Sequence, residues 1–304
     1  MEKEPQMNEI LRGNQSRFGH VITAMATPLF EDGQIDFAGA GRLASWLVEQ
    51  GNDALVINGT TGESPATSDA EKLDLLDAVI AAIGANKVIA GAGGSDTRHV
   101  CKLATASAAK GVAGILSVAP YYNKPCQDGM YRHFRAVADA AAIPVLLYNV
   151  PGRSVVNIEA TTTARIAQDQ ENIVGTKEAS GNMMQVADIV ARTPSTFDVY
   201  SGDDGTLLPQ LAVGGCGIIS VISHIATPRV RQVCDCWFAG DMAAALAAFL
   251  PTLAITRMIF AQPSPAPTKA ALHILGQPAG PVRLPLVDLT PDQKETLRLF
   301  MQDI

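Results

Sequence analysis

The sequence predicts an α/β fold, a (β/α)8 TIM barrel with a C-terminal helical appendage. Short apolar runs alternate with alanine-rich amphipathic segments eight times along the chain. Eight such units are typical of a (β/α)8 barrel of ~250 residues, and near-continuous apolar runs are expected for parallel strands buried on both faces. An open, doubly wound sheet remains the alternative, because hydrophobic periodicity does not distinguish it from a barrel.

The predicted elements follow one another in a regular order. The strands span residues 21–25, 54–57, 87–90, 113–118, 144–148, 173–177, 197–200 and 217–221. Helices are expected between and after them at residues 36–50, 69–84, 97–110, 128–142, 159–169, 182–192, 204–213 and 227–239. After residue 240 the alternation stops, and further helices are expected at residues 241–260, 266–275 and 290–303.

The chain is therefore expected to have three parts. A polar segment of mixed charge predicts a flexible N-terminal extension over residues 1–18, and this segment lacks the apolar core of a secretory signal. Residues 19–239 are expected to form the barrel, and residues 240–304 the C-terminal helical region. Pro251 interrupts the longest apolar stretch, Met242 to Ile255, which falls short of the ~20 residues that span a bilayer.

Composition excludes several classes of protein. With 47% hydrophobic residues the chain is not intrinsically disordered. A net charge of −7 and the lack of a long basic run argue against nucleic-acid or membrane partners. The five cysteines form no C-x-x-C pair and are expected to be reduced, as in a cytoplasmic protein. Neither a dinucleotide-binding fingerprint nor a phosphate-binding P-loop occurs.

The segment 175–179, GTKEA, gives the strongest indication of chemistry. Barrel enzymes have their active sites at the C-terminal ends of the strands, and Lys177 ends an apolar strand, where burying a charged amine is costly. Burial favours the neutral amine, which can attack a ketone to form a Schiff base. Gly175, on the same strand face, is expected to leave room beside the barrel axis. The alternative is a lysine that pairs with a carboxylate.

Two other strand ends carry groups that can bind a carboxylate. Thr60 and Thr61 follow the second strand between glycines, where hydroxyls and backbone amides can act together. The same segment could simply be a turn and a helix cap. After the fifth strand, Arg153 could grip a substrate carboxylate with its bidentate guanidinium or form a surface ion pair.

Tyrosines occur at the fourth and fifth strand ends. Tyr148 ends the fifth predicted strand, and Tyr121 and Tyr122 follow the fourth. Such phenols either pack against neighbours or relay protons. The residues alone do not decide between these roles.

The sequence favours no metal site. Asp203 and Asp204 follow the seventh strand, but companion ligands are missing, so these residues are expected to cap the next helix. No two histidines have H-x-x-x-H spacing, and all five are interpreted as structural or surface residues: His20, His99, His133, His224 and His273.

Seven short motifs occur in a fixed order along the chain. They are GTTGES (59–64), PYYNKP (120–125), YNVPGR (148–153), GTKEA (175–179), SGDD (201–204), GIISV (217–221) and RLPL (283–286). In this order they resemble the dihydrodipicolinate synthase / N-acetylneuraminate lyase family of class I aldolases, over about residues 19–290. Two of them, YYNKP and YNVPGR, are similar to the synthase branch, because lyases of the family usually lack an arginine at the place of Arg153.

The resemblance implies a reaction and a nucleophile. Members of the synthase branch condense pyruvate with aspartate 4-semialdehyde in lysine and diaminopimelate biosynthesis. Lys177 would form the imine with pyruvate, with no cofactor and no metal. Thr60, Tyr122 and Tyr148 would form a hydroxyl relay that moves protons.

The resemblance also implies binding residues and an assembly. Thr61, together with Thr60, would hold the pyruvate carboxylate, Arg153 the carboxylate of the semialdehyde, and the carbonyl of Ile219 would line the pyruvate pocket. A homotetramer of tight dimers is expected, in which Tyr122 reaches the neighbour's site and Tyr121 lies at the dimer contact.

One departure from the family concerns regulation. Lysine-inhibited members have a histidine and a glutamate that contact lysine, and ungapped matching places Lys72 and His99 there. A cationic Lys72 would repel lysine, and His99 cannot replace a carboxylate. Feedback by lysine is therefore expected to be weak or absent.

Two other functions remain as hypotheses. One is an aldolase or lyase for another 2-keto acid, such as N-acetylneuraminate or a 2-keto-3-deoxy sugar acid, which Arg153 disfavours. The other is a non-catalytic barrel that binds a keto acid as a sensor or scaffold, which the intact Lys177, Tyr148 and Thr60 disfavour.

Overall fold

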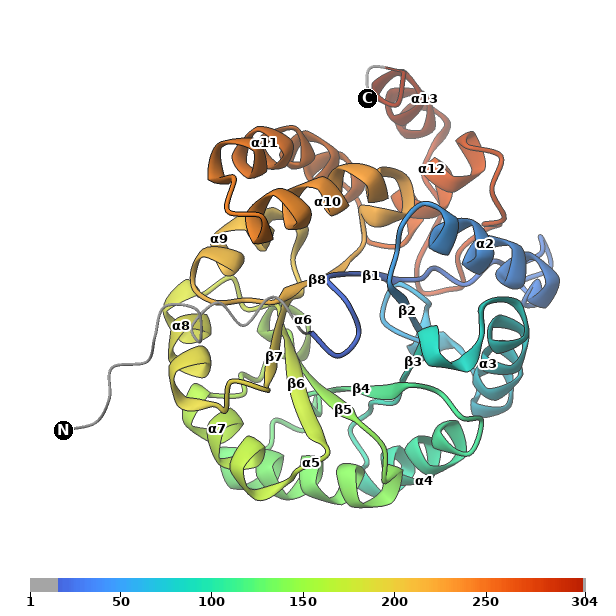
Figure 1. Cartoon of the computed structure of the whole chain (residues 1–304). Helices are drawn as coiled ribbons and strands as arrows, with labels where there is room; N and C mark the ends of the chain where they lie inside the picture. The colour runs from blue at the N-terminus through green and yellow to red at the C-terminus, as the bar shows by residue number, and fades with distance from the viewer. Residues whose placement is uncertain (1–15, 303–304) are drawn as a thin grey trace.

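The computed structural model describes residues 16–302 and contains a closed barrel of eight parallel strands in sequence order. β1 closes the barrel by pairing with β8, where Ile22 lies opposite Ile219. The helices form a ring around the strands (Figure 1). This confirms the predicted TIM barrel and rules out the open sheet. The strands are β1 (Val21–Ala24), β2 (Ala54–Ile57), β3 (Val88–Gly91), β4 (Gly114–Val118), β5 (Val145–Asn149), β6 (Ile173–Glu178), β7 (Asp198–Ser201) and β8 (Gly217–Ser220).

The helices of the barrel lie near the predicted ranges. Several begin at a side-chain cap, such as Ser68, which forms a capping box with Glu71. They are α2 (Phe37–Glu49), α3 (Asp69–Ile83), α4 (Thr97–Ala108), α5 (Gln127–Ala141), α6 (Pro151–Ser154), α7 (Ala160–Asp169), α8 (Met183–Arg192), α9 (Leu207–Ala212) and α10 (Ser223–Phe238), with 3-10 turns η2 (Ser64–Ala66), η3 (Ala85–Lys87) and η4 (Asp204–Thr206).

Three local features differ from the prediction. The short helix α6 was not expected, and the predicted helix at 204–213 divides into η4 and α9. α10 begins at Ser223 instead of 227, because a first turn precedes a kink at Ala226. Pro228, which lacks a backbone N–H, follows this kink, and the helix predicted from residue 227 corresponds to the part of α10 after it.

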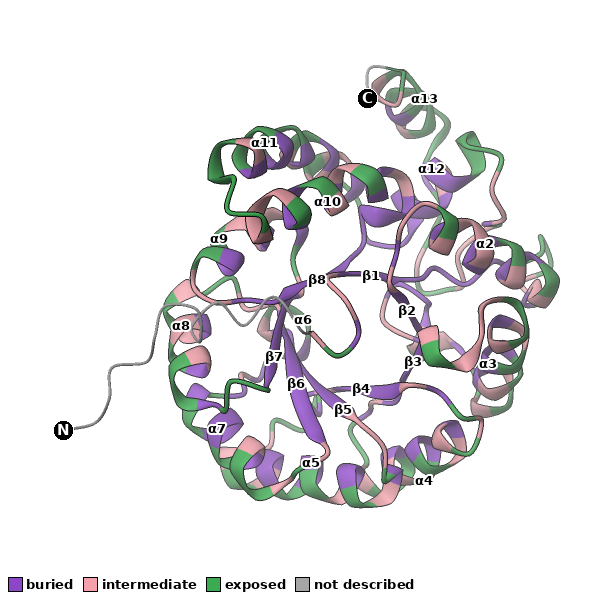
Figure 2. Cartoon of the chain, viewed as in Figure 1, coloured by how far each residue is buried: buried purple, intermediate pink, exposed green. Residues whose placement is uncertain are grey.

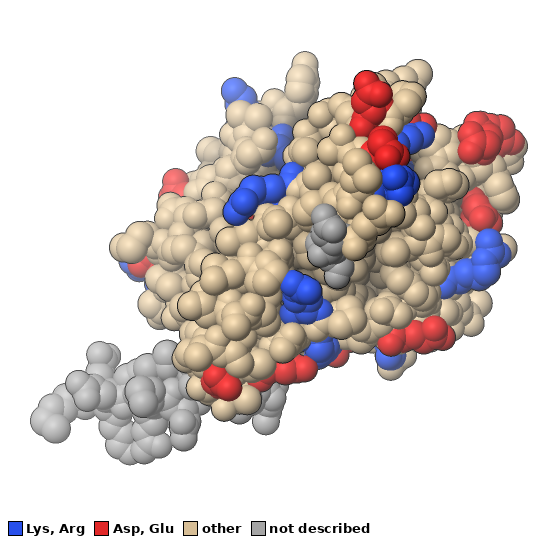
Figure 3. Space-filling model, turned by 90° about the horizontal axis from the view of Figure 1, so that it is seen from above, with Lys and Arg blue, Asp and Glu red and all other residues tan. Residues whose placement is uncertain are grey.

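Two apolar layers stabilise the barrel. One fills its interior and includes Ile22, Val56 and Leu146, and the other lies between the strands and the surrounding helices. Figure 2 shows the strands almost wholly buried and the helices buried on their inner sides. On the face shown in Figure 3, charged side chains of both signs are interspersed over a mostly uncharged surface.

The start of the barrel packing lies earlier than predicted. Residues 1–15 of the expected extension lie outside the described residues. Phe18, however, is 8% exposed and belongs to the cluster in the barrel interior. The backbone N–H of Arg17 donates to Asp198 at 2.9 Å. Residues 16–18 therefore close the end of the barrel opposite the C-terminal strand ends.

The C-terminal region consists of α11 (Met242–Ile259), α12 (Ala266–Ile274) and α13 (Pro291–Phe300). Within the described residues, α11 is the one helix with the length and hydropathy of a membrane span, yet it packs against α10 and buries Ala245 and Phe249. It continues through Pro251, in agreement with the helix predicted over residues 241–260. The expected helical appendage is confirmed.

Candidate active site

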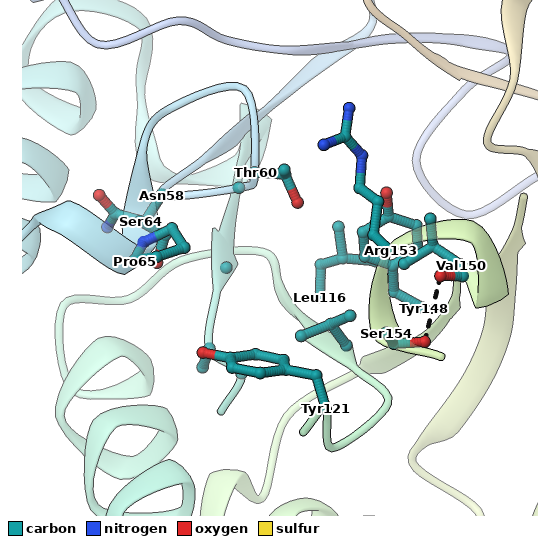
Figure 4. A pocket seen from close by; sticks show the side chains of 15 residues that line it. Asn58, Thr60, Ser64, Pro65, Leu116, Tyr121, Tyr148, Val150, Arg153 and Ser154 are labelled. Atoms are coloured by element: carbon teal, nitrogen blue, oxygen red, sulfur yellow. Dashed lines mark hydrogen bonds between the residues drawn. The ribbon is translucent and has the colours of Figure 1, made fainter. Parts of the chain in front are cut away.

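The C-terminal ends of the strands surround a cavity of about 490 Å³. Five of the residues that the sequence predicts for the site line it: Thr60, Thr61, Tyr148, Arg153 and Lys177. A smaller hollow of about 270 Å³ adjoins this cavity and shares part of its lining (Figure 4). The closed barrel thus brings together three segments that are far apart in the sequence.

Lys177 lies on β6 between Tyr148 of β5 and Tyr200 of β7, its partners in the strand register. The lysine is 5% exposed, and its Nζ lies 4.4 Å from the centroid of the Tyr148 ring. No carboxylate within residues 16–302 forms an ion pair with it, so the alternative expectation of a paired lysine is not met. The amine borders the cavity, where it can attack a bound carbonyl carbon.

A glycine beside Lys177 gives its side chain space. A Cβ at Gly202 would lie 3.0 Å from Cγ and 3.1 Å from Cε of the lysine, so a larger residue would displace its stem. Gly175 does not have the expected role. A Cβ there would lie 2.4 Å from the carbonyl oxygen of Asp198 and 2.9 Å from Leu146, so Gly175 permits close strand packing instead.

The two threonines lie on a tight loop after β2. The N–H of Glu63 donates to the carbonyl of Thr60 at 3.1 Å, and the Thr27 hydroxyl donates to the carbonyl of Gly62 at 2.8 Å. In Figure 4, Thr60 lies between Ser64 and Arg153, and all three line the hollow. Hydroxyls and backbone amides of this loop can bind a carboxylate.

Arg153 reaches the cavity from α6, directly after β5. Asn149, which ends β5, stabilises the segment that contains α6, because its Oδ1 accepts a hydrogen bond from the N–H of Ile158 at 2.9 Å. Its amide donates to both carboxylate oxygens of Glu178, at 2.9 and 3.1 Å. Burial raises the pKa of Glu178. The pair therefore links the Arg153 loop to the residue that follows Lys177.

Sequence reasoning missed a contribution from the C-terminal region. Thr256, Arg257 and Phe260, around the end of α11, also line the cavity. Two arginines and one lysine thus face a lining with a single carboxylate, Asp203. This excess of positive charge suits an anionic substrate. The available signal was an arginine near the end of an otherwise apolar helix.

Two predicted residues do not line the cavity. Tyr122 is 91% exposed with φ of 71°, a strained conformation for a tyrosine, whereas its neighbour Tyr121 lines the smaller hollow. Ile219 is fully buried on β8, two residues before Val221, which does line the cavity. Within one chain Tyr122 does not join the predicted relay, and the role of the Ile219 carbonyl stays a prediction.

The two adjacent acids have separate hydrogen-bond partners, which lie in the same turn for Asp203 and at the end of β8 for Asp204. Asp203 caps η4 by accepting from the N–H of Gly205 at 2.9 Å. Asp204 is buried, which raises its pKa, and accepts from the Ser220 hydroxyl at 2.5 Å and the Val221 N–H at 3.1 Å. The cap is confirmed for Asp203. No group of three or more His, Cys, Asp or Glu side chains in the described part of the chain fits a metal ion.

The histidines do not belong to the cavity lining. Burial lowers the pKa of His133 and of His224 to about 4, so both are neutral at pH 7. His224 accepts from the N–H of Ala26 at 3.0 Å and donates to the carbonyl of Val221 at 2.7 Å. This residue therefore links the ends of β1 and β8, a structural role.

Lys72 and His99 meet at a shared acid. The Lys72 Nζ lies 3.6 Å from Asp69, and the His99 Nε2 lies 2.7 Å from the same carboxylate. Although partial burial opposes it, the hydrogen bond from His99 lowers the pKa of Asp69. The acid of this cluster is already paired, which leaves the cluster poorly suited to bind a further ammonium group.

Comparison with known proteins gives one consistent family. The profile of the dihydrodipicolinate synthetase family matches residues 17–304. A 4-hydroxy-tetrahydrodipicolinate synthase of Symbiobacterium thermophilum is 50% identical over 92% of this chain and 96% of its own length. One of Streptomyces coelicolor is 48% identical over 94% of this chain and 95% of its own.

Solved structures agree with this result. A synthase of the family from Cyanidioschyzon merolae, solved with lysine bound, superposes with a TM-score of 0.92 and 41% identity, over 95% of this chain and 98% of that one. A dihydrodipicolinate synthase of Bacillus anthracis gives the same TM-score and identity, over 95% and 99%.

Proposed function

Since the chain belongs to the dihydrodipicolinate synthetase family, we propose that it is a 4-hydroxy-tetrahydrodipicolinate synthase, a lyase of the class I aldolase type. Its reaction condenses pyruvate with L-aspartate 4-semialdehyde in the biosynthesis of diaminopimelate and lysine. The observation that carries this proposal is the buried Lys177 amine beside Tyr148, in a cavity that Thr60 and Arg153 also line.

Covalent catalysis by Lys177 explains the chemistry. The Lys177 amine attacks the ketone carbon of pyruvate, and loss of water gives an imine. Loss of a methyl proton gives an enamine, whose carbon attacks the aldehyde of the second substrate. The amino group of that substrate then attacks the imine carbon and releases Lys177 as the ring closes. Hydroxyl groups of Tyr148 and Thr60 carry protons between these steps, and no organic cofactor takes part.

Substrate binding follows from the positions of the polar side chains. The loop that carries Thr60 and Thr61 holds the pyruvate carboxylate, and the carbonyl of Ile219 lines the pyruvate end of the pocket. Arg153 holds the carboxylate of the semialdehyde through its guanidinium fork. Arg257 adds positive charge that attracts both anions.

A second copy of the chain completes the site in this proposal. Tyr122 is exposed and strained, which suits a side chain that enters a neighbouring subunit. Tyr122 of the partner subunit would then join Thr60 and Tyr148 in the relay. We place the enzyme in the cytoplasm as a homotetramer built from such dimers.

The decisive experiment measures consumption of aspartate 4-semialdehyde by the purified protein with and without pyruvate. Coupling the product to an excess of dihydrodipicolinate reductase gives the rate. Pyruvate-dependent turnover of ~1–100 per second is expected. Turnover only with keto-sugar acids would replace the synthase by a sugar-acid aldolase. No imine after borohydride treatment with any keto acid would favour the non-catalytic barrel.

Arg153→Ala is expected to raise the KM for aspartate 4-semialdehyde about 10- to 100-fold, because a charge-assisted hydrogen bond to the substrate contributes about 1.5–3 kcal/mol. The KM for pyruvate should change less than about threefold, since the threonine loop holds that substrate. Steady-state kinetics with each substrate varied in turn checks this. Arg192→Ala, on the exposed last turn of α8, is the control. Equal changes in both KM values would contradict the assignment.

Free lysine is expected to inhibit this enzyme weakly or not at all. The cationic Lys72 repels an added ammonium group, and the only acid of its cluster, Asp69, is already paired. Initial rates measured over a lysine titration test this expectation, with the variant Lys72→His/His99→Glu expected to gain sensitivity. Inhibition of the unmodified enzyme at sub-millimolar lysine would show the expectation to be wrong.

A further inference from the structure

Two residues of the sequence motifs, neither of which has a role in the proposed reaction, meet in the structure. Glu63, from GTTGES, and Arg283, from RLPL, are 220 positions apart but share a hydrogen bond. Glu63 follows Thr60 and Thr61 on the same loop, is 4% exposed, and does not line the cavity. Its φ of 58° lies in the left-handed region, which residues with a side chain rarely adopt. The surroundings of Glu63 must therefore hold this conformation.

The C-terminal region binds both carboxylate oxygens of Glu63. The Nζ of Lys269, on α12, lies 2.5 Å from one oxygen and also donates to the carbonyl of Pro281 at 2.6 Å. The backbone N–H of Arg283 donates to the other oxygen at 2.7 Å. The side chains of Lys269 and Glu63 are 2% and 3% exposed, and burial lowers the pKa of Lys269 although Glu63 opposes this. Removing either partner would leave a buried charge without its counterion.

The guanidinium of Arg283 binds the segment that follows the threonine loop. It donates to the carbonyl of Ala66, the last residue of η2, at 2.8 Å, and to the carbonyl of Gly33 at 2.8 and 3.0 Å. It also lies 2.5 Å from Glu71 on α3, and this hydrogen bond lowers the pKa of Glu71 to about 2. The segment from Glu63 to Glu71 is thus tied to one arginine of the C-terminal region.

We propose that Glu63, Lys269 and Arg283 form a clamp through which the C-terminal helical region sets the position of the Thr60–Thr61 loop for substrate binding. This inference rests on the proposed role of the two threonines in holding the pyruvate carboxylate. The three residues of the clamp are positioning residues, because none of them lines the cavity. On its other side the loop is held by the hydrogen bond that the Thr27 hydroxyl donates to the carbonyl of Gly62.

If the clamp positions the threonine loop, its loss should raise the KM for pyruvate and leave the KM for aspartate 4-semialdehyde nearly unchanged. A loosened threonine loop binds the pyruvate carboxylate poorly, so the KM for pyruvate rises. Lys177 and Tyr148 lie on β6 and β5, which the clamp does not touch, so the imine still forms when pyruvate is saturating. The KM for aspartate 4-semialdehyde, which Arg153 governs, stays within about threefold of the unmodified enzyme.

The test compares Glu63→Gln and Arg283→Lys with Arg231→Lys in the full-length protein. Arg231 is a matched control, because it donates to the carbonyl of Gly51 at 2.6 and 3.0 Å and pairs with Asp53 at 2.6 Å, at the opposite end of the barrel. For each variant, the pyruvate concentration that gives half-maximal imine is measured by borohydride trapping and mass spectrometry. Circular dichroism confirms that each variant is folded.

The proposal expects at least a fivefold rise in half-saturating pyruvate for both clamp variants and less than twofold for Arg231→Lys. A smaller rise in either folded clamp variant, or an equal rise in the control, overturns it. If Glu63→Gln does not fold, Arg283→Lys decides by the same threshold. Failure of the proposed function itself is distinguishable, because the unmodified protein would then form no imine with pyruvate.

Discussion

Replacing Lys177 with alanine is expected to abolish turnover, with a loss of about 10⁴-fold or more, because the nucleophile of a covalent mechanism has no substitute. Lys177 is the only lysine among the described residues that line the cavity and the adjoining hollow. The coupled assay measures the rate. Mass spectrometry after borohydride treatment with pyruvate should show the reduced adduct on the unmodified protein and none on the variant.

Lys110→Ala is the matched control for this substitution. Lys110 pairs with Asp77 at the surface at 2.5 Å and lines neither the cavity nor the adjoining hollow. This variant should keep both the rate and the adduct. An unchanged rate in Lys177→Ala would remove Lys177 as the nucleophile, and an adduct on a different lysine would locate the reaction elsewhere.

Tyr148→Phe is expected to lower kcat about 10²- to 10³-fold, which is the range that positioned acid–base groups contribute. Phenylalanine keeps the ring that lies 4.4 Å from the Lys177 amine and removes only the hydroxyl. The KM values should therefore change little, and the imine should form more slowly instead of disappearing. Single-turnover measurements of imine formation and of enamine consumption show which proton transfer is slowed.

Tyr131→Phe is the control, which tests whether the loss of a buried phenol hydroxyl outside the cavity also lowers kcat. The Tyr131 hydroxyl donates to Asp169 at 2.7 Å, between α5 and α7. Full activity is expected for this variant. A loss of less than fivefold in Tyr148→Phe would exclude its hydroxyl from the relay.

The site residues at the strand ends could be predicted from the sequence, because the barrel fold places the C-terminal ends of its strands at one rim. Once eight apolar runs indicate a barrel, every residue that ends a strand is placed at the same rim. Thr60, Tyr148, Arg153 and Lys177 are therefore expected at one rim, and all four line the cavity.

Predictions about local space were less successful, because they depend on neighbours from other segments. Gly175 and Gly202 look alike in the sequence, but only Gly202 lies against the stem of Lys177. Phe18 precedes the first strand and still enters the barrel interior.

The sequence by itself predicted eight strand–helix units, the amine at the end of β6 and the family of the protein, because periodicity and short motifs are local properties. The tertiary structure decided that the strands close into a barrel instead of an open sheet. Only the tertiary structure placed Arg257 at the cavity, Tyr122 outside it, and Lys269 and Arg283 on Glu63. These contacts join segments separated by up to 220 positions. Charged groups so far apart in the chain form pairs only where tertiary packing buries them together. The local sequence around Glu63 therefore does not indicate which residues pair with it.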